Sequence, residues 1–336
     1  MLVSNGDCLM ATVIARQIKK DYPGSHLTWA ISDLCRNMIL NDPDVDAIWE
    51  VKLSSKQAGL NEEWHAFRKQ AIARKNRGEF DEMFFTQIYP DNLQYFDGTT
   101  RGTIYGAYPH PITVSARPVL ELTEEEKNKV DRFAEKHELK KYQQVILLEC
   151  SSFSGQSFVN SQWALSLAED LVEKFPDLAI LLSTHEKLPV IHPRIIPANE
   201  ISLRENVALS HYCHLLVGCS SGVTWACTSE KAKRIPFIQF LHRAKGFSFA
   251  SVAYDHAWWK LDETQILEST RKEPAAAFEI ISCYLDKGIE EARSSYHELL
   301  RPRRISMYKY AFLLFRRGQI AGAMKVIRNF RKRNKI

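Results

Sequence analysis

The sequence predicts an α/β protein with parallel sheets in two doubly wound halves, and three observations support this fold class. Its 336 residues are enough for two domains of about 150 residues each. Short apolar runs suited to buried strands alternate along the chain with segments of helical periodicity. A strand–turn–helix segment also occurs in each half. Such alternation is typical of βαβ units, which form parallel sheets.

The first half, residues 1–138, opens on the short apolar start Leu2-Val3-Ser4, and Pro23-Gly24 ends its first helix. Thr123 and the three glutamates after it match a helix N-cap with an acidic first turn. We expect that helix to end the domain. Residues 88–118 are expected to be irregular, either as binding loops or as plain connections. The expected helices of this half are 8–21, 34–40 and 61–77, and the expected strands are 26–31, 47–51 and 82–86.

The second half, residues 139–290, repeats the alternation, and residues 291–336 follow it as a basic tail. The apolar run 215–218 has the length of a buried strand, and it breaks into Cys219, two serines and a glycine before a helix-compatible segment. The other strands are expected at 145–148, 178–182 and 235–240, and helices at 163–174, 202–211, 263–268 and 274–287.

The turn Ser220-Ser221-Gly222 has two interpretations. After a parallel strand, backbone N–H groups and hydroxyls of such a turn point beyond the carboxyl edge of the sheet, where nucleotide phosphates and sugars bind. The other interpretation is an ordinary tight connection. The second strand–turn–helix segment, at the start of the chain, favours the binding interpretation.

Composition narrows the function classes. The 45% apolar and 25% charged content is that of an ordinary globular protein, and no apolar run has the roughly 20 residues of a membrane helix. Seven cysteines without a CxxC pair, and a start without signal-peptide features, predict reduced thiols and a cytoplasmic location. HxH, HExxH and GxGxxG motifs do not occur, so a metal catalyst and a dinucleotide oxidoreductase lack support.

Several motifs in one collinear order resemble glycosyltransferase family 9, the heptosyltransferases. Near the start these are Gly6-Asp7 with its Leu/Ala/Thr helix, Tyr22-Pro23 and Asn41-Asp42-Pro43-Asp44-Val45-Asp46. Further motifs are Arg117-Pro118 with Leu122-Thr123, the tryptophan helix from Trp163, His185-Glu186, and the segment from Ser202-Leu203-Arg204 to Gly222. The resemblance covers about residues 2–285. It implies the GT-B architecture: two Rossmann-like domains that face a central cleft, with the acceptor on the first and the nucleotide-sugar on the second.

The resemblance also implies site residues. Asp7 matches the position of the family's catalytic base, with Gly6 beside it on the acceptor side. A carboxylate at a helix N-terminus is also a good cap, so local chemistry alone leaves both roles open. The implied donor-binding residues are Ser151, Ser152, Glu186, Arg204, Ser220, Ser221 and Gly222.

The chain departs from the family pattern at two places. The family's Asp-Ser-Gly-x-x-His reads Ser220-Ser221-Gly222-Val223-Thr224-Trp225, which removes a carboxylate and an imidazole. The loop after Glu149 carries no charge until Glu169, so Lys187, Arg204, Arg243 or Lys245 would have to supply a cation for a diphosphate.

The function expected from this resemblance is an inverting, metal-independent glycosyltransferase without a cofactor. It would move a sugar from a nucleotide-diphosphate donor to a glycan or glycolipid, with Asp7 as general base. The alternative is a catalytically silent GT-B scaffold that binds a sugar nucleotide or a partner protein, and a sugar-nucleotide epimerase ranks third. No nucleic-acid partner is expected, because the sequence has no reading module.

The tail is strongly basic. Residues 301–336 hold twelve Lys or Arg and no Asp or Glu, so the remaining 300 residues carry 33 (45 minus 12) basic against 40 acidic side chains. Helices are expected over 308–316 and 320–333, with Ile320, Met324, Ile327 and Phe330 on one face of the second. Such a helix suits an anionic membrane surface, which predicts a peripheral location at the cytoplasmic membrane face. A hairpin packed on the protein body is the alternative.

Overall fold

The computed structural model describes residues 2–53, 60–152, 155–189, 192–243 and 249–334, and it divides the chain into two compact units. One unit comprises 1–119 together with 302–336, and the other comprises 120–301. The domain boundaries predicted at 138 and 290 differ from this division. The helix after Thr123 packs with the second unit, and the tail helices pack with the first.

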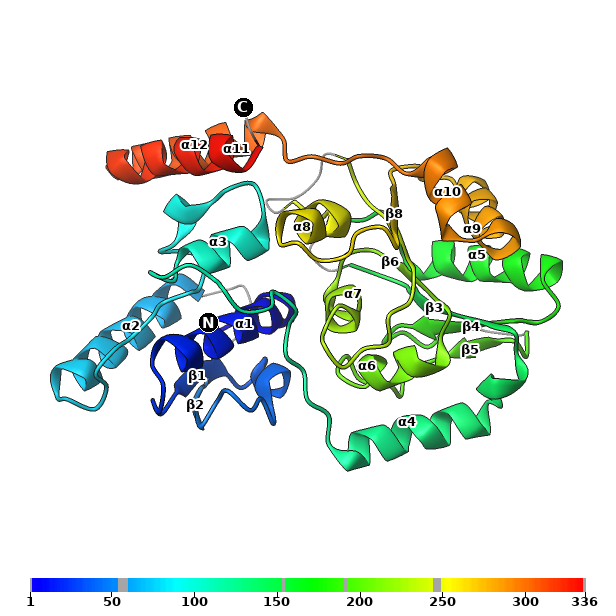
Figure 1. Cartoon of the computed structure of the whole chain (residues 1–336), viewed down its shortest axis with the longest axis horizontal. Coiled ribbons are helices and arrows are strands. Elements are labelled where there is room, and N and C mark those ends of the chain that lie inside the picture. Colours follow the sequence, from blue (N-terminus) through cyan, green and yellow to red (C-terminus); the bar gives the residue numbers. More distant parts are fainter. Residues whose placement is uncertain (1, 54–59, 153–154, 190–191, 244–248, 335–336) are drawn as a thin grey trace. The chain divides into compact units, whose positions relative to one another are not determined.

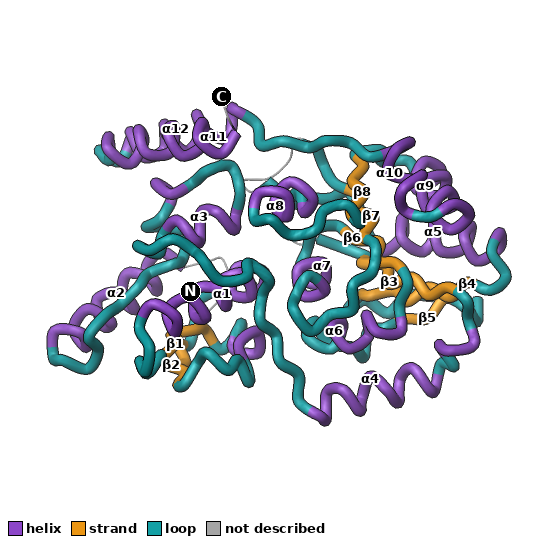
Figure 2. Tube along the Cα trace, in the orientation of Figure 1, coloured by secondary structure: helices purple, strands orange, loops and turns teal. Residues whose placement is uncertain are grey.

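The second unit is built on a six-stranded parallel sheet in the order β5-β4-β3-β6-β7-β8 (Figures 1 and 2). This is the doubly wound order, in which the chain winds outward twice from the centre of the sheet. The strands are β3 (Gln144–Glu149), β4 (Leu178–Ser183), β5 (Ile195–Pro197), β6 (Leu215–Gly218), β7 (Phe237–Phe240) and β8 (Ile266–Ser269).

Helices α5, α9 and α10 of the second unit pack on the sheet through their apolar residues. A core cluster joins α5, α9 and α10 to the sheet residues Ile146, Ile180 and Val217, all at most 1% exposed. The helices are α4 (Glu124–Lys136), α5 (Ser161–Lys174), α6 (Asn206–Leu209), α7 (Gly222–Cys227), α8 (Val252–Trp258), α9 (Pro274–Lys287) and α10 (Ile289–Tyr296). Thr123 forms the predicted capping box of α4 with Glu126.

The first unit has a smaller sheet than predicted. Among the described residues it contains one parallel pair, β1 (Thr28–Ser32) with β2 (Ala47–Val51). The predicted strand 82–86 is wrong: this stretch makes no strand ladder, and the nearby Gln87 side chain instead accepts from the backbone N–H groups of Leu2 and Val3 at 3.0 and 3.3 Å. The helices are α1 (Asn5–Asp21), α2 (Leu60–Asn76), α3 (Thr100–Gly106), α11 (Arg304–Arg316) and α12 (Ile320–Asn334).

Two further helix predictions are corrected by the structure. Residues 263–268 were expected to be helical, but β8 occupies 266–269 because Phe237–Phe240 offers a parallel partner. The helix predicted over 34–40 is a single 3-10 turn, Arg36–Ile39. Isolated short segments have little helical stability of their own, so tertiary pairing decides their structure.

Candidate functional site

The predicted donor residues gather at one edge of the second unit's sheet. The winding direction reverses between β3 and β6, and ligands of doubly wound folds bind beyond the carboxyl ends of strands at this reversal. Ser151 and Ser152 follow β3, while Ser220 and Ser221 follow β6. Since β3 and β6 are paired neighbours, the structure brings these four serines to the same edge.

Side chains tie the loop after β3 to the turn after β6. The Gln156 side-chain amide donates to the carbonyl of Ser220 at 2.6 Å, and the Cys219 thiol donates to the carbonyl of Ser151 at 3.2 Å. The backbone N–H of Ser157 donates to the Ser152 hydroxyl at 3.3 Å. Hydrogen bonds within and between the loop after β3 and the turn after β6 therefore hold the four serines at this edge of the sheet.

A buried carboxylate, Glu149, lies beneath the β6–α7 turn. Its side chain is 1% exposed and accepts from the backbone N–H of Cys219 at 2.8 Å and of Val223 at 3.1 Å. It also accepts from the N–H and the hydroxyl of Thr224, at 3.3 and 2.7 Å, and from the hydroxyl of Ser221. Glu149 thus caps the first turn of α7 from a neighbouring strand.

This arrangement changes the meaning of the Ser220-Ser221-Gly222 turn. The donors of this turn were predicted to bind an anion, but the Glu149 carboxylate already accepts from Ser221 and from two α7 amides. Ser220 is also engaged, because its N–H donates to Gln239 at 2.8 Å and its hydroxyl donates to the carbonyl of Ala250 at 2.6 Å. An anion near α7 would meet the negative charge of Glu149 rather than free donors.

The glycines of this segment allow close packing. A Cβ added at Gly218, the last residue of β6, would clash with the side chains of Gln239 and Thr224. A Cβ at Gly222, the first residue of α7, would lie 2.5 Å from a methyl group of Leu203, which belongs to the predicted Ser202-Leu203-Arg204 motif. Both glycines therefore have a packing reason that is independent of any ligand.

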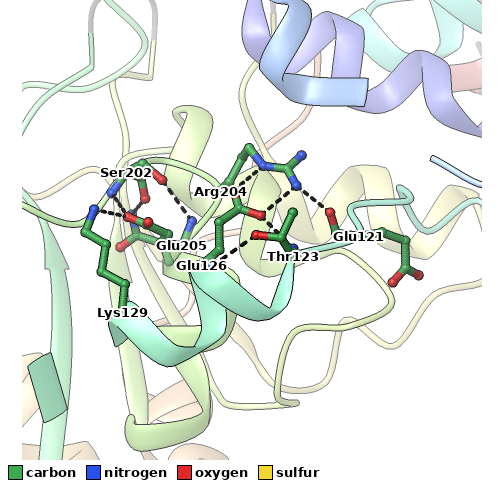
Figure 3. A network of polar contacts seen from close by, with 8 residues as sticks. Glu121, Thr123, Glu126, Lys129, Ser202, Arg204 and Glu205 are labelled. Carbon is green, nitrogen blue, oxygen red and sulfur yellow. Dashed lines mark hydrogen bonds and ion pairs between the residues drawn. The ribbon is translucent and has the colours of Figure 1, made fainter. Parts of the chain in front are cut away.

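Arg204, predicted to bind the donor, forms an ion pair within the second unit (Figure 3). Its guanidinium donates to both carboxylate oxygens of Glu126, at 2.6 and 3.0 Å, and to the carbonyl of Glu121. Burial alone would raise the pKa of Glu126, but hydrogen bonds from Arg204 and Thr123 lower it below its ordinary value. The side chain of Arg204 is 4% exposed, so these contacts give it a structural role in fastening α4.

The other predicted donor groups lie on exposed loops at the same sheet edge. Glu186 and Lys187 follow β4 and are exposed, and the Glu186 N–H donates to the Thr184 hydroxyl at 3.0 Å. Arg243, also exposed, follows β7. Lys245 lies outside the described residues. Lys187 and Arg243 are therefore the described members of the predicted cation set that remain on the surface of this edge.

In the first unit, Asp7 lies in the first turn of α1, and Gly6 lies directly before it. The residue that caps this helix, Ser4, has φ +73°, in the left-handed region that non-glycine residues seldom adopt. Ser220 before α7 has φ +53°. Both turns singled out in the sequence therefore hold a non-glycine residue in a conformation that costs on the order of 1 kcal/mol.

The environment of Asp7 favours its protonated form. Its pKa is raised from 3.8 to about 7, chiefly by desolvation, while a hydrogen bond from Ser4 lowers it and the Cys35 thiol raises it further. The residue keeps partial contact with solvent. A carboxyl group with a pKa near neutrality is suited to accept and return a proton.

Sequence reasoning did not identify Glu149 or Glu268 as candidates. Glu268 is fully buried in β8, and burial raises its pKa to about 7 against hydrogen bonds from Ser251, Ala253 and Val252. Each glutamate ends or lies in an apolar run, and a single carboxylate in such a run is the sequence signal that could have found them. Among the described residues no group of three His, Cys, Asp or Glu is placed to hold a metal ion. The described helices include none with the length and apolarity needed to cross a membrane.

Solved structures with this fold include glycosyltransferases. The chain aligns with a glycosyl transferase family 9 structure from Veillonella parvula over 86% of this chain and 91% of that one, at TM-score 0.53 and 14% identity. It aligns with the ADP-heptose LPS heptosyltransferase II of E. coli over 84% and 96%, at TM-score 0.52 and 13% identity. No protein-family model and no curated protein matches the sequence. The expected resemblance to family 9 is thus confirmed at the level of the α/β fold with parallel sheets.

Proposed function

We propose that the protein is a glycosyltransferase of the heptosyltransferase type. It transfers a sugar from a nucleotide-diphosphate donor to a hydroxyl group of a glycan or glycolipid. Support comes from the fold, from the collinear motifs, from the position of Ser220 and Ser221 between β6 and α7, and from the position of Asp7 in the first turn of α1. The observation that carries the proposal is the Asp7 carboxyl, whose pKa near 7 suits a general base.

In the proposed reaction, Asp7 takes the proton of the acceptor hydroxyl as its oxygen attacks the anomeric carbon. The bond from that carbon to the diphosphate breaks, the nucleotide leaves with the electron pair, and the configuration inverts. Desolvation raises the pKa of Asp7 toward neutral pH. At a pH near its pKa, about half of the carboxyl groups are deprotonated, and the carboxylate is basic enough to take a proton from the acceptor.

For the departing diphosphate we propose the hydroxyls of Ser151 and Ser152 together with Arg243 and Lys187. The four follow β3, β7 and β4, which end at one edge of the sheet. This assignment replaces the α7 amides, whose donors Glu149 accepts. The proposed reaction needs no metal ion, since the basic side chains would balance the developing charge.

A second candidate function is a catalytically silent scaffold that binds a sugar nucleotide or a partner protein. Two observations favour the scaffold. Glu149 accepts the hydrogen bonds of the donors in the β6–α7 turn, and Arg204 is paired with Glu126, so neither set of groups remains for a sugar-nucleotide donor.

The two candidates differ in turnover. Nucleoside diphosphates and their sugars are first screened by thermal shift, since a bound ligand stabilises the folded state by mass action. Release of the free nucleotide is then measured with and without extracted glycolipid as acceptor. Acceptor-dependent release supports the transferase, whereas binding without release by any donor supports the scaffold.

Variants separate the sites. Arg243→Ala and Lys187→Ala should weaken nucleotide binding, and Arg132→Ala, an exposed arginine on α4, serves as the charge-matched control. Equal affinity in all three variants would contradict the proposed diphosphate contacts.

A further inference from the structure

The basic tail forms a helical hairpin that packs on the first unit. The buried face of α11 (Met307, Tyr310, Leu314) and that of α12 (Val326, Phe330) meet Leu93 and Phe96 in one core cluster. The sequence placed Phe330 and Ile327 on a membrane-facing stripe, but Phe330 is fully buried and Ile327 is partly buried. The predicted face of α12 is therefore divided: Phe330 and Ile327 pack against the core, whereas Ile320 and Met324 are exposed.

Six large apolar side chains of the hairpin are exposed, four on α11 and two at the start of α12. On α11, Ile305, Tyr308, Phe312 and Phe315 follow one another at helical spacing and are 65, 58, 62 and 59% exposed. Ile320 and Met324, at the start of α12, are 61 and 63% exposed. Because residues 317–319 join the two helices, Phe315 and Ile320 both lie beside the turn. We call these six residues the hairpin stripe.

The surroundings of the hairpin stripe are basic. Lys309 and Arg316 lie on the same side of α11 as the stripe, and Arg328 and Arg331 continue the exposed face of α12 beyond Met324. All four are exposed. The chain contains no Asp or Glu after Glu298. The surface thus combines large apolar side chains with cations and contains no acidic residue of the hairpin.

The hairpin is firmly attached, so its exposed face is a fixed feature of the first unit. Arg333, whose side chain is 1% exposed, pairs with Asp97 at 2.8 Å. Gly98, at φ +106°, lies so close to Pro302 that an added Cβ would be 2.8 Å from its ring. Lys325 lies 3.7 Å from the ring centre of Tyr95.

We propose that the hairpin stripe binds in the interfacial region of a bilayer that contains anionic lipids. Tyr is enriched at the headgroup level, Phe suits the apolar face of an interfacial helix, and nearby Lys and Arg are attracted to the negative surface of such a bilayer. An acidic protein groove would complement the cations equally, but six large exposed apolar side chains along α11 and the start of α12 suit an insertion depth of about 5–10 Å into lipid. This inference is independent of the proposed transferase activity.

The test is sedimentation of the full-length protein with vesicles of phosphatidylcholine alone or mixed with phosphatidylglycerol. The protein should sediment with the anionic vesicles and should not sediment with the neutral ones. High salt should weaken the binding to the anionic vesicles. Phe312→Ser with Phe315→Ser should reduce the affinity by about tenfold or more. Arg328→Gln and Arg331→Gln should each reduce it about fivefold.

The controls use exposed residues outside the hairpin stripe. Leu299→Ser removes a 68% exposed leucine, and Arg132→Gln removes an exposed α4 cation; both should bind like the wild type. Unchanged melting temperatures show that the variants are folded. Absence of vesicle binding, equal binding to neutral vesicles, or a solution dimer that Phe312→Ser dissociates would each overturn the proposal.

Discussion

Two carboxyl groups beside helix N-termini, Asp7 at α1 in the first unit and Glu149 at α7 in the second, have opposite surroundings. Glu149 accepts hydrogen bonds from three backbone N–H groups and two hydroxyls. The pKa of Asp7 is instead raised to about 7 by desolvation, against one opposing hydrogen bond from Ser4. Both lie beside a turn with a non-glycine residue at positive φ.

In this pair of carboxyl groups, the one with many donors holds a turn together, and the one with a single opposing hydrogen bond has the raised pKa. Donors that surround a carboxylate stabilise it and occupy its lone pairs, which leaves none for a substrate proton. A carboxyl that is desolvated with few donors remains able to exchange a proton. By this criterion Glu149 stabilises the turn, and Asp7 carries the proposed chemistry.

The largest effect is expected for Asp7→Asn. This change keeps the shape of the side chain and removes the base, so turnover with an identified donor and acceptor should fall by about 100-fold or more. Nucleotide affinity should stay within about twofold, measured by thermal shift. Asp81→Asn, an exposed aspartate of the same unit, is the control and should keep full turnover. Full turnover in Asp7→Asn would remove Asp7 from the mechanism.

Glu149→Ala should destabilise the protein by about 3 kcal/mol, because it leaves several buried N–H groups of the β6–α7 turn without an acceptor. Glu149→Gln keeps one acceptor oxygen, so its loss of unfolding free energy should be smaller. Chemical denaturation measures both free energies of unfolding. A loss below about 1 kcal/mol in Glu149→Ala would show that the carboxylate does not hold the turn.

Arg204→Met tests the structural role of a predicted donor contact. The variant loses the two-pronged ion pair with Glu126 and should lose about 2 kcal/mol of stability. Nucleotide affinity should remain within about twofold of the wild type. A large loss of affinity with unchanged stability would restore the donor-binding role predicted from the sequence.

The pH dependence of stability sharpens the comparison. The folded-state pKa of Asp7 lies above its value of 3.8, so the native protein holds an extra proton between pH 3.8 and about 7. Its contribution to stability therefore falls as the pH rises through this window. Asp7→Asn lacks this decline and should gain about 1–2 kcal/mol over the wild type at pH 8, allowing for partial solvation. Urea unfolding at pH 5 and 8 measures the difference, and equal differences at both pH values would contradict it.

The smallest effect is expected for Ser4→Gly. The Ser4 hydroxyl lowers the pKa of Asp7, so its removal should raise that pKa and move the pH–rate profile to higher pH. Glycine also accepts the positive φ at this position without strain. A shift of the profile to lower pH would show that Ser4 does not stabilise the carboxylate.

Much of the fold follows from sequence periodicity. The strands from Val145 and Leu215 and the helix from Trp163 are where apolar patterns place them, because each strand is an uninterrupted apolar run and the helix has apolar residues at helical spacing. The failures are segments with a weaker pattern, such as 82–86 and 263–268, whose state depends on a distant partner. No local signal encodes the parallel partner of β8.

The sequence predicted the position of the candidate donor site, but it did not predict which side chains hydrogen-bond to each other there. The sequence located the β6–α7 turn and the four serines that follow β3 and β6, but the strand expected before α1 does not form in the described residues 2–4. It could not show that Glu149 would occupy the turn donors or that Glu126 would pair with Arg204, since each contact joins residues more than 70 positions apart. The burial of Phe330 in the tail depended in the same way on the distant Phe96.

The most direct test of the central claim is the pKa of the Asp7 side chain, measured by carbon-13 NMR of the carboxyl group with Asp7→Asn for assignment. The account predicts titration near pH 7. Titration near the ordinary aspartate value of about 4 would contradict it, because such a carboxylate is too weak a base for the proposed proton transfer.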